Sequence, residues 1–112
     1  MMTSDTIFAQ SSGAGVAGIA VIRISGPASG WVLEKIGGGL PEPRRASLRR
    51  LTDPVTGETI DRAVVLWTPG PNSVSGEDVA EFHVHGSQAV ATALLAAFSR
   101  FERVRPAEAG EF

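Results

Sequence analysis

The stretch from Ile19 to Ser25, Ile-Ala-Val-Ile-Arg-Ile-Ser, constrains the fold of this chain more than any other segment. Its β-branched residues favour a strand, and apolar side chains occupy both of the alternating faces of that strand. This pattern is typical of a strand that lies inside a sheet rather than at its edge. The fold must therefore provide a central strand here, and that strand must accommodate the charge of Arg23.

Glycine and proline divide the rest of the chain, with 13 Gly and 7 Pro among 112 residues. This density predicts many turns between short elements. Alternating apolar residues predict further strands over residues 6–10, 46–52, 59–67, 78–85 and 103–105. The second and third of these are separated by the turn Asp53-Pro54-Val55-Thr56-Gly57, which predicts a hairpin.

Two helices are predicted from apolar residues at helical spacing. The first follows Pro27, which suits the first helical position, and the second follows Ser87, a reasonable N-cap. Their apolar faces consist of Ala28, Val32, Leu33 and Ile36 in the first, and of Val90, Leu94, Ala97, Phe98 and Phe101 in the second. The order β-β-α-β-β-β-α-β predicts an α+β domain with a mixed sheet and two main helices.

Composition narrows the functional classes. A length of 112 residues supports one domain, and 43% hydrophobic with 20% charged residues is ordinary for a folded chain. The absence of Cys excludes disulfides, cysteine-based zinc fingers and cysteine nucleophiles within this chain. A formal net charge of -2 gives no general attraction to nucleic acid.

The sequence predicts no membrane association. The longest apolar run, Val16 to Ile22, falls far short of the roughly 20 residues that span a bilayer. The N-terminus, Met1-Met2-Thr3-Ser4-Asp5, lacks the basic region of a signal peptide. We therefore expect a cytoplasmic location.

Arg23 is the first candidate functional residue. It shares one face of its strand with Ile19, Val21 and Ser25, so its charge must meet a carboxylate, a carbonyl cluster or a ligand, or reach the rim. A structural ion pair or an edge position is the simpler interpretation. The functional interpretation is an anchor for an anion or carboxylate, to which the guanidinium fork is suited.

A second cluster lies in the strand predicted at 78–85, where Glu81, His83 and His85 share a face with Val79. His83 and His85 would lie about 6.6 Å apart at their Cα atoms, a workable spacing for two metal ligands. Glu81 and His85 would lie about 13 Å apart, too far to hold one ion together. Hydrogen bonds from the histidines to backbone or carboxylates are the simpler expectation, and no metal site is predicted.

Other features favour structural roles. The segment Gly13-Ala14-Gly15-Val16-Ala17-Gly18 lacks the Gly-Lys-Ser/Thr ending of a Walker loop and precedes a strand rather than a helix, so it is not predicted to bind phosphate. Trp31 and Trp67 could each pack in the core or offer a stacking platform, and Trp67 beside its Pro-Gly-Pro turn favours the core or its rim. On these grounds alone, the sequence indicates an α+β domain with an anion pocket near Arg23 and Glu81.

Six segments, taken in order, are similar to the N-terminal domain of the tRNA-modification GTPase family MnmE, also called TrmE. Each segment alone is a weak signal, but their order and spacing cover essentially the whole chain, least closely between Gly37 and Thr59. They are Asp5-Thr6-Ile7-Phe8-Ala9-Gln10, Gly18-Ile19-Ala20-Val21-Ile22-Arg23-Ile24-Ser25-Gly26, Trp67-Thr68-Pro69-Gly70-Pro71-Asn72-Ser73, Ser75-Gly76-Glu77-Asp78-Val79-Ala80-Glu81, His85-Gly86 and Arg105-Pro106-Ala107-Glu108-Ala109-Gly110-Glu111-Phe112.

The resemblance implies a function that composition does not. Family members work with a partner protein, MnmG, to modify carbon five of the wobble uridine of certain tRNAs. A formyl- or methylene-tetrahydrofolate supplies the one-carbon unit. The N-terminal domain resembles the folate-binding fold of the glycine-cleavage T protein and mediates homodimerisation. The family's strand arginine falls on Arg23 and its folate-contacting glutamate on Glu81, so the resemblance implies that both bind the folate.

The resemblance also implies that residues 1–112 are the folate-binding and dimerisation domain of a longer protein. The family continues past Gly-Glu-Phe into helical and GTPase domains, which use GTP, magnesium and potassium, and ends in a reactive cysteine. Neither Gly-Lys-Ser/Thr nor Cys occurs here, so we expect no catalytic residue in this chain.

The sequence departs from the family pattern at two places: the family's His-Gly-Gly is His85-Gly86-Ser87, and the glycine loop is spaced differently. An interaction module without independent ligand binding is the alternative function, and a small metal-dependent enzyme using His83 and His85 is the third.

Overall fold

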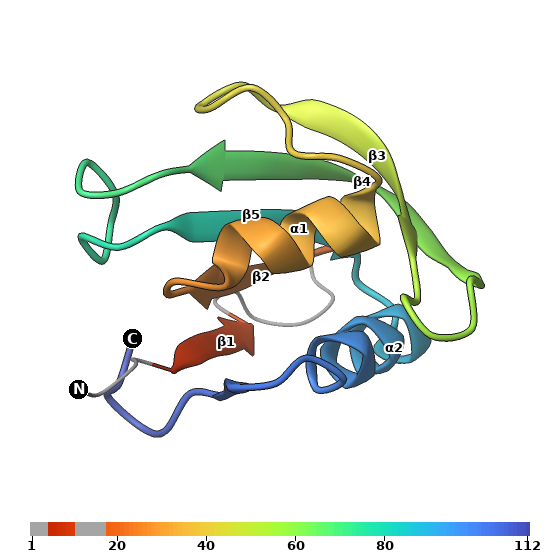
Figure 1. The fold of residues 1–112 in the computed structure, drawn as a ribbon. Coiled ribbons are helices and arrows are strands. Elements are labelled where there is room, and N and C mark those ends of the chain that lie inside the picture. Colours follow the sequence, from red (N-terminus) through yellow and green to blue (C-terminus); the bar gives the residue numbers. More distant parts are fainter. Residues whose placement is uncertain (1–4, 11–17) are drawn as a thin grey trace.

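The computed structural model of the chain describes residues 5–10 and 18–112. It contains one mixed sheet of six strands and two helices, which confirms the predicted α+β class (Figure 1). The elements are β1 (Thr6–Gln10), β2 (Ile19–Ser25), α1 (Ser29–Gly37), β3 (Ser47–Thr52), β4 (Thr59–Thr68), β5 (Val79–His85), α2 (Gln88–Phe98) and β6 (Val104–Pro106).

The strands lie in the order β3-β4-β5-β2-β1-β6. All neighbours are antiparallel except β1 and β6, which are parallel and place the first and last strands side by side. Strand β2 is inside the sheet between β1 and β5, as its apolar pattern predicted. The predicted hairpin is formed by β3 and β4.

One face of the sheet carries the hydrophobic core. Ala20, Ile22 and Ile24 of β2 point to this face, and they are almost fully buried. Helix α1 crosses it through Val32, Leu33 and Ile36, and α2 adds Leu94, Ala97 and Phe98. The ring of Phe98 packs at 5.1 Å from the rings of both Phe8 and Phe82. Trp67 also belongs to this core, with 7% exposure, as expected.

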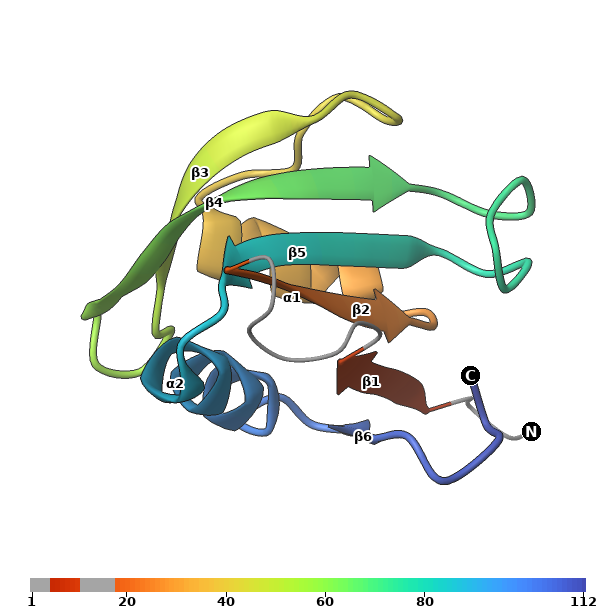
Figure 2. The same ribbon diagram turned by 180° about the vertical axis from the view of Figure 1, so that it is seen from behind.

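The other face, which we call the open face, is seen in Figure 2 from the side away from α1. It carries the alternate residues of the same strands, including Arg23 of β2 and Glu81 and His83 of β5. These side chains are half-buried rather than buried, so the sheet presents polar groups here beside aliphatic ones. A covered apolar face and a solvated face with polar groups are common in antiparallel sheets.

The two helices begin in different ways, α2 at a side-chain cap and α1 at a hydrogen bond to another segment. Ser87 is the N-cap of α2, and its side chain accepts a hydrogen bond from Val90 N at 3.2 Å, as predicted. The prediction for Pro27 was wrong, because α1 begins at Ser29 after the N-cap Ala28. A tertiary hydrogen bond fixes this start instead: Ala28 N donates to Thr6 Oγ1 at 2.8 Å.

The two helices are short, with 9 and 11 residues. Neither described helix has the length and apolar character needed to cross a membrane. The glycine segment 13–18, which was not predicted to bind phosphate, lies outside the described residues except for Gly18.

Gly26 joins β2 to α1 at a place where a side chain cannot fit. Its φ is +137°, and a Cβ atom would lie 2.7 Å from Thr6 Cα. We expect Gly26→Ala to lower the free energy of unfolding by about 3 kcal/mol, because backbone strain and a backbone clash combine. Urea denaturation measures the loss. The control is Gly57→Ala, with φ +77° and open space where a Cβ would lie, for which we expect about 1 kcal/mol. Equal losses in both variants would show that the clash contributes nothing.

Candidate ligand-binding site

Arg23 and Glu81 form an ion pair on the open face. They are direct partners in the register of β2 and β5, although 58 residues separate them in sequence. Arg23 Nε donates to Glu81 Oε2 at 3.0 Å, and Arg23 Nη2 lies 2.9 Å from the same oxygen. The side chains are 27% and 15% exposed, so water screens the pair only partly. Of the expected partners for Arg23, which were a carboxylate, a carbonyl cluster, a ligand or the rim, the structure shows the carboxylate.

His83 occupies the other oxygen of the same carboxylate. His83 Nε2 lies 3.0 Å from Glu81 Oε1. Because an ionised carboxylate only accepts hydrogen bonds, the imidazole must carry its proton on Nε2 and donate it. Glu81 is therefore held from both sides, by a guanidinium on Oε2 and by an imidazole on Oε1.

His85 has a separate partner. Its Nδ1 lies 2.8 Å from Asp61 Oδ1, and its backbone N–H donates to Asp61 Oδ2 at 2.9 Å. The interpretation that both histidines hydrogen-bond to carboxylates is confirmed. Among residues 5–10 and 18–112, no three His, Cys, Asp or Glu side chains are grouped closely enough to hold a metal ion.

A cavity of about 260 Å³ opens beside Arg23 on the open face. It is lined by Ala9, Gln10, Arg23, Val74 and Phe112. Ala9 is the register partner of Arg23 on β1, so these two residues form the part of the lining that belongs to the sheet. The cavity therefore combines one cationic group with aliphatic and aromatic surface, which is a common composition for a small-molecule site.

The wall that contains Val74 belongs to the loop between β4 and β5, which is bonded to the end of β2. Ser25 Oγ at the end of β2 lies 2.6 Å from Ser75 Oγ of this loop. Ser25 is 2% exposed, so the contact anchors the loop at a buried point. Val74 itself is 80% exposed and projects beside the cavity.

The wall that contains Phe112 is held by a charged turn. Arg105 Nη1 donates to Glu111 Oε1 at 2.9 Å, and Glu108 N donates to the same oxygen at 2.8 Å. These contacts, the hydrogen bond from Arg105 first, lower the pKa of Glu111 from 4.5 to about 2. Sequence reasoning missed Gln10, Val74 and Phe112 as lining residues, since their common position depends on three segments that meet only in the fold.

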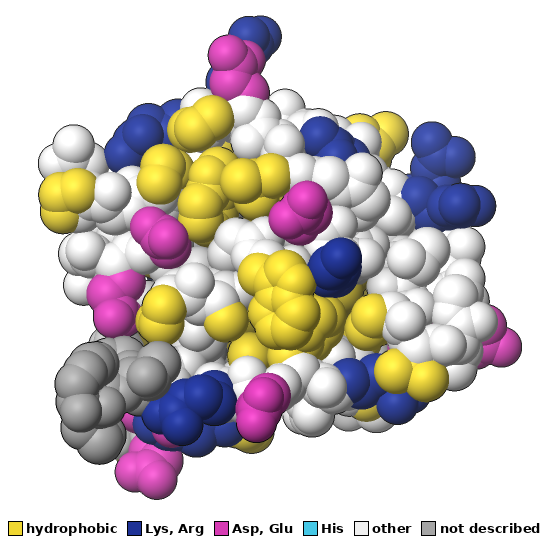
Figure 3. Space-filling model, viewed as in Figure 1, with side chains coloured by type: hydrophobic (Ala, Val, Ile, Leu, Met, Phe, Trp, Pro, Cys, Tyr) yellow, Lys and Arg dark blue, Asp and Glu magenta, His cyan; other side chains and the backbone are white. Residues whose placement is uncertain are grey.

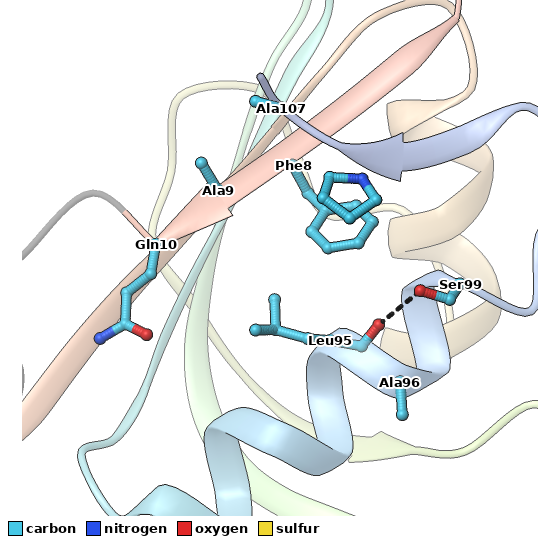
Figure 4. A pocket seen from close by; sticks show the side chains of 8 residues that line it. Phe8, Ala9, Gln10, Leu95, Ala96, Ser99 and Ala107 are labelled. Atoms are coloured by element: carbon cyan, nitrogen blue, oxygen red, sulfur yellow. Dashed lines mark hydrogen bonds between the residues drawn. The ribbon is translucent and has the colours of Figure 1, made fainter. Parts of the chain in front are cut away.

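A larger cavity, of about 370 Å³, lies at the other side of β1, between β1, β6 and α2 (Figure 4). Figure 4 shows Phe8 and Leu95 turned into it, and the hydroxyl of Ser99 bonded back to the carbonyl of Leu95. Its lining contains no charged side chain: Phe8, Ala9, Gln10, Leu95, Ala96, Ser99, Pro106 and Ala107. It therefore lacks a charged group such as Arg23, which the smaller cavity has.

The helix side of the molecule carries an aromatic pair, of which Trp31 is exposed and Phe101 is buried. Trp31 of α1 is 49% exposed, and its ring packs edge-on against Phe101 at 5.1 Å. Figure 3 shows hydrophobic side chains gathered on this face, with charged residues around them. Trp31 thus packs at the rim of the core and is a less defined candidate than the charged site on the open face.

The fold and the paired charges define an α+β domain with a compact polar site on one sheet face. The family described as "GTP-binding protein TrmE N-terminus" matches residues 6–112, so the chain belongs to this family. The family resemblance inferred from the six segments is confirmed.

Individual relatives agree over the whole chain. It is 58% identical over 110 residues to the "tRNA modification GTPase MnmE" of Beijerinckia indica, covering 98% of this chain and 24% of that protein. It is 59% identical over 109 residues to the human "5-taurinomethyluridine-[tRNA] synthase subunit GTPB3, mitochondrial", covering 96% of this chain and 22% of that protein. The chain thus spans about a quarter of the length of such relatives.

The lowered pKa of Glu111 predicts a pH dependence of stability. A carboxyl group whose pKa falls from 4.5 to about 2 on folding stabilises the protein above pH 4.5, and this stabilisation is lost as the pH falls from 4.5 to 2. We expect Glu111→Gln to lower the melting temperature at pH 6 and to have little effect near pH 2. Thermal unfolding followed by circular dichroism at both pH values measures this.

The control for that experiment is Glu58→Gln, which alters an exposed carboxylate in the turn between β3 and β4. We expect its melting temperature to track that of the unsubstituted chain at both pH values. A difference between Glu111→Gln and the unsubstituted chain that stays constant from pH 6 to pH 2 would contradict the role assigned to Glu111.

Proposed function

We propose that the chain binds a tetrahydrofolate derivative at Arg23 and Glu81. The observation that carries the proposal is the guanidinium of Arg23, which lines a cavity of about 260 Å³ and is bonded to the half-buried carboxylate of Glu81. Ligand pockets commonly measure about 300–1,000 Å³, so this cavity suits one ring system of a folate while the rest of the ligand extends along the surface. The family resemblance independently assigns its folate-contacting residues to these two positions.

The donor and acceptor chemistry fits a pterin ring. The amino group and ring N–H of a pterin are hydrogen-bond donors, and the Glu81 carboxylate is an acceptor with about four lone-pair positions. Arg23 can hold a polar or anionic group of the ligand while keeping contact with Glu81 through one of its two N–H groups. Val74 and Phe112 offer apolar surface on which the ring can pack.

For the longer protein, we propose the activity of the family. In this proposal, a GTPase that contains this domain acts with MnmG on carbon five of a tRNA wobble uridine, with formyl- or methylene-tetrahydrofolate as the one-carbon donor. GTP, magnesium and potassium would bind outside residues 1–112. Family membership and the names of the relatives support this assignment. A cytoplasmic location and the likeness of this domain to the glycine-cleavage T protein stay predictions.

Titration with 5-formyltetrahydrofolate, followed by calorimetry, tests the site. We expect Arg23→Ala and Glu81→Gln each to weaken binding by about tenfold or more, because each loses a hydrogen bond to a charged group. The matched control is Arg62→Ala, which removes an exposed arginine from β4 on the open face. Its affinity should stay within about twofold of the unsubstituted chain. Equal affinity in all three variants would overturn the assignment of Arg23 and Glu81.

We propose as a second function that the open face binds a second copy of the chain. Leu48 and Val64 are register partners on β3 and β4, and they are 62% and 39% exposed. Ile19 adds a third aliphatic side chain, 42% exposed, on the same face of β2. Exposed aliphatic groups on one sheet face are typical of an interaction surface, and the family resemblance implies a homodimer. If dimerisation proves to be the only activity, the domain is an interaction module.

Sedimentation velocity with and without 5-formyltetrahydrofolate separates these functions. We expect a dimer, and we expect Leu48→Asp with Val64→Asp to shift it to monomer by placing two unpaired charges in the interface. The control is Val55→Asp, in the turn between β3 and β4, where the side chain is 68% exposed and lies outside the strands. A dimer that forms equally well in the double variant would contradict the proposed surface, and a dimer that never binds the folate would favour the module.

A further inference from the structure

His83 contacts Glu81, and the proposed function does not yet use it. It lies two residues along β5, on the same face, and the register of the sheet places Val64 of β4 and Val21 of β2 on either side of it. The two aliphatic side chains limit how far the imidazole can turn toward the neighbouring strands. The ring therefore extends along β5 toward Glu81. The 3.0 Å contact between His83 Nε2 and Glu81 Oε1 is the result.

Arg23 and His83 contact different oxygens of the Glu81 carboxylate, so His83 affects the direction of that carboxylate. Both Arg23 nitrogens converge on Oε2, at 3.0 and 2.9 Å, and together they use the two lone-pair positions of that oxygen. His83 takes one position on Oε1. The second position on Oε1 is the one that a ligand can use, and its direction depends on where the imidazole holds the carboxylate plane.

We propose that His83 is a positioning residue of this site: its Nε2–H holds the Glu81 carboxylate so that the remaining lone pair of Oε1 faces an N–H of the ligand. The inference rests on the proposed folate site, and it adds a residue on which affinity depends. Without His83, Glu81 can turn about its terminal torsion while Arg23 follows on Oε2, because this torsion is soft. The ligand would then have to order the carboxylate at a cost in affinity.

The charged groups around His83 on the open face come from four strands. They are Glu81 on its own strand, Arg23 on β2, Arg62 on β4 and Arg50, the register partner of Arg62, on β3. His85 lies further along β5 and is bonded to Asp61 instead. Glu81 is thus the acceptor that the imidazole contacts. We expect substitution of His83 to alter the site by changing the orientation of the Glu81 carboxylate.

Calorimetric titration with 5-formyltetrahydrofolate of three variants tests the proposal. We expect His83→Ala to weaken binding about fivefold, because the ligand must then order the Glu81 carboxylate itself. His83→Gln, whose side-chain amide can still donate to Oε1, should stay within about twofold of the unsubstituted chain. The control His85→Ala removes an imidazole from the same strand without removing a partner of Glu81, and it should also stay within about twofold.

A second measurement does not depend on the ligand. Long-range ¹H–¹⁵N correlation spectra distinguish the two neutral tautomers of a histidine, and the expected form of His83 carries its proton on Nε2. Circular dichroism confirms that each variant is folded. Absence of binding by the unsubstituted chain would overturn the folate site itself. Where that chain does bind, either unchanged affinity in His83→Ala, or equal losses in His83→Ala and His83→Gln, or an Nδ1-protonated His83 would overturn the positioning role alone.

Discussion

The register between β2 and β5 is the constraint on which both the core and the site depend. It sets Ile22 opposite Phe82 on the covered face and Arg23 opposite Glu81 on the open face. Because side chains alternate along a strand, a slip of β2 by one residue would turn Arg23 into the core and Ile22 toward water. The hydrophobic burial of Ile22 and Phe82 therefore excludes a slip of one residue, and the observed register places Arg23 directly opposite Glu81.

Alternation is also why much of the fold could be predicted from the sequence. The apolar residues of β5 recur at Ala80, Phe82 and Val84, whereas those of β2 occupy both faces, and the observed bounds of β2, Ile19–Ser25, agree with the predicted ones. A charge inside an apolar strand needs a partner, so the sequence predicted that Arg23 must find a carboxylate, a carbonyl cluster, a ligand or the rim. It could not show that this partner is Glu81, because pairing across 58 residues is decided by the order of strands in the sheet.

Features decided by contacts between distant segments were beyond the sequence patterns. Pro27 has the properties of a first helical residue, but a hydrogen bond from Ala28 to Thr6 of β1 sets the start of α1 two residues later. The lining of the cavity also depends on contacts between segments that are distant in sequence. Phe112 lines the cavity beside Arg23 next to Glu111, which is bonded to Arg105, and Val74 lines it next to Ser75, which is bonded to Ser25. Neither pair has a local spacing that signals a pocket.

The partial burial of Glu81 decides what such a site can do. In full exposure, water would screen the contacts of the carboxylate with Arg23 and His83, and each would contribute little. In full burial, every remaining lone pair would need a partner, and a vacant one would cost stability. At 15% exposure, the carboxylate is held by its two neighbours and still has a face that water or a ligand can reach. A donor of the right shape then replaces weakly held water on an acceptor whose direction is already fixed, so the ordering cost has been met during folding.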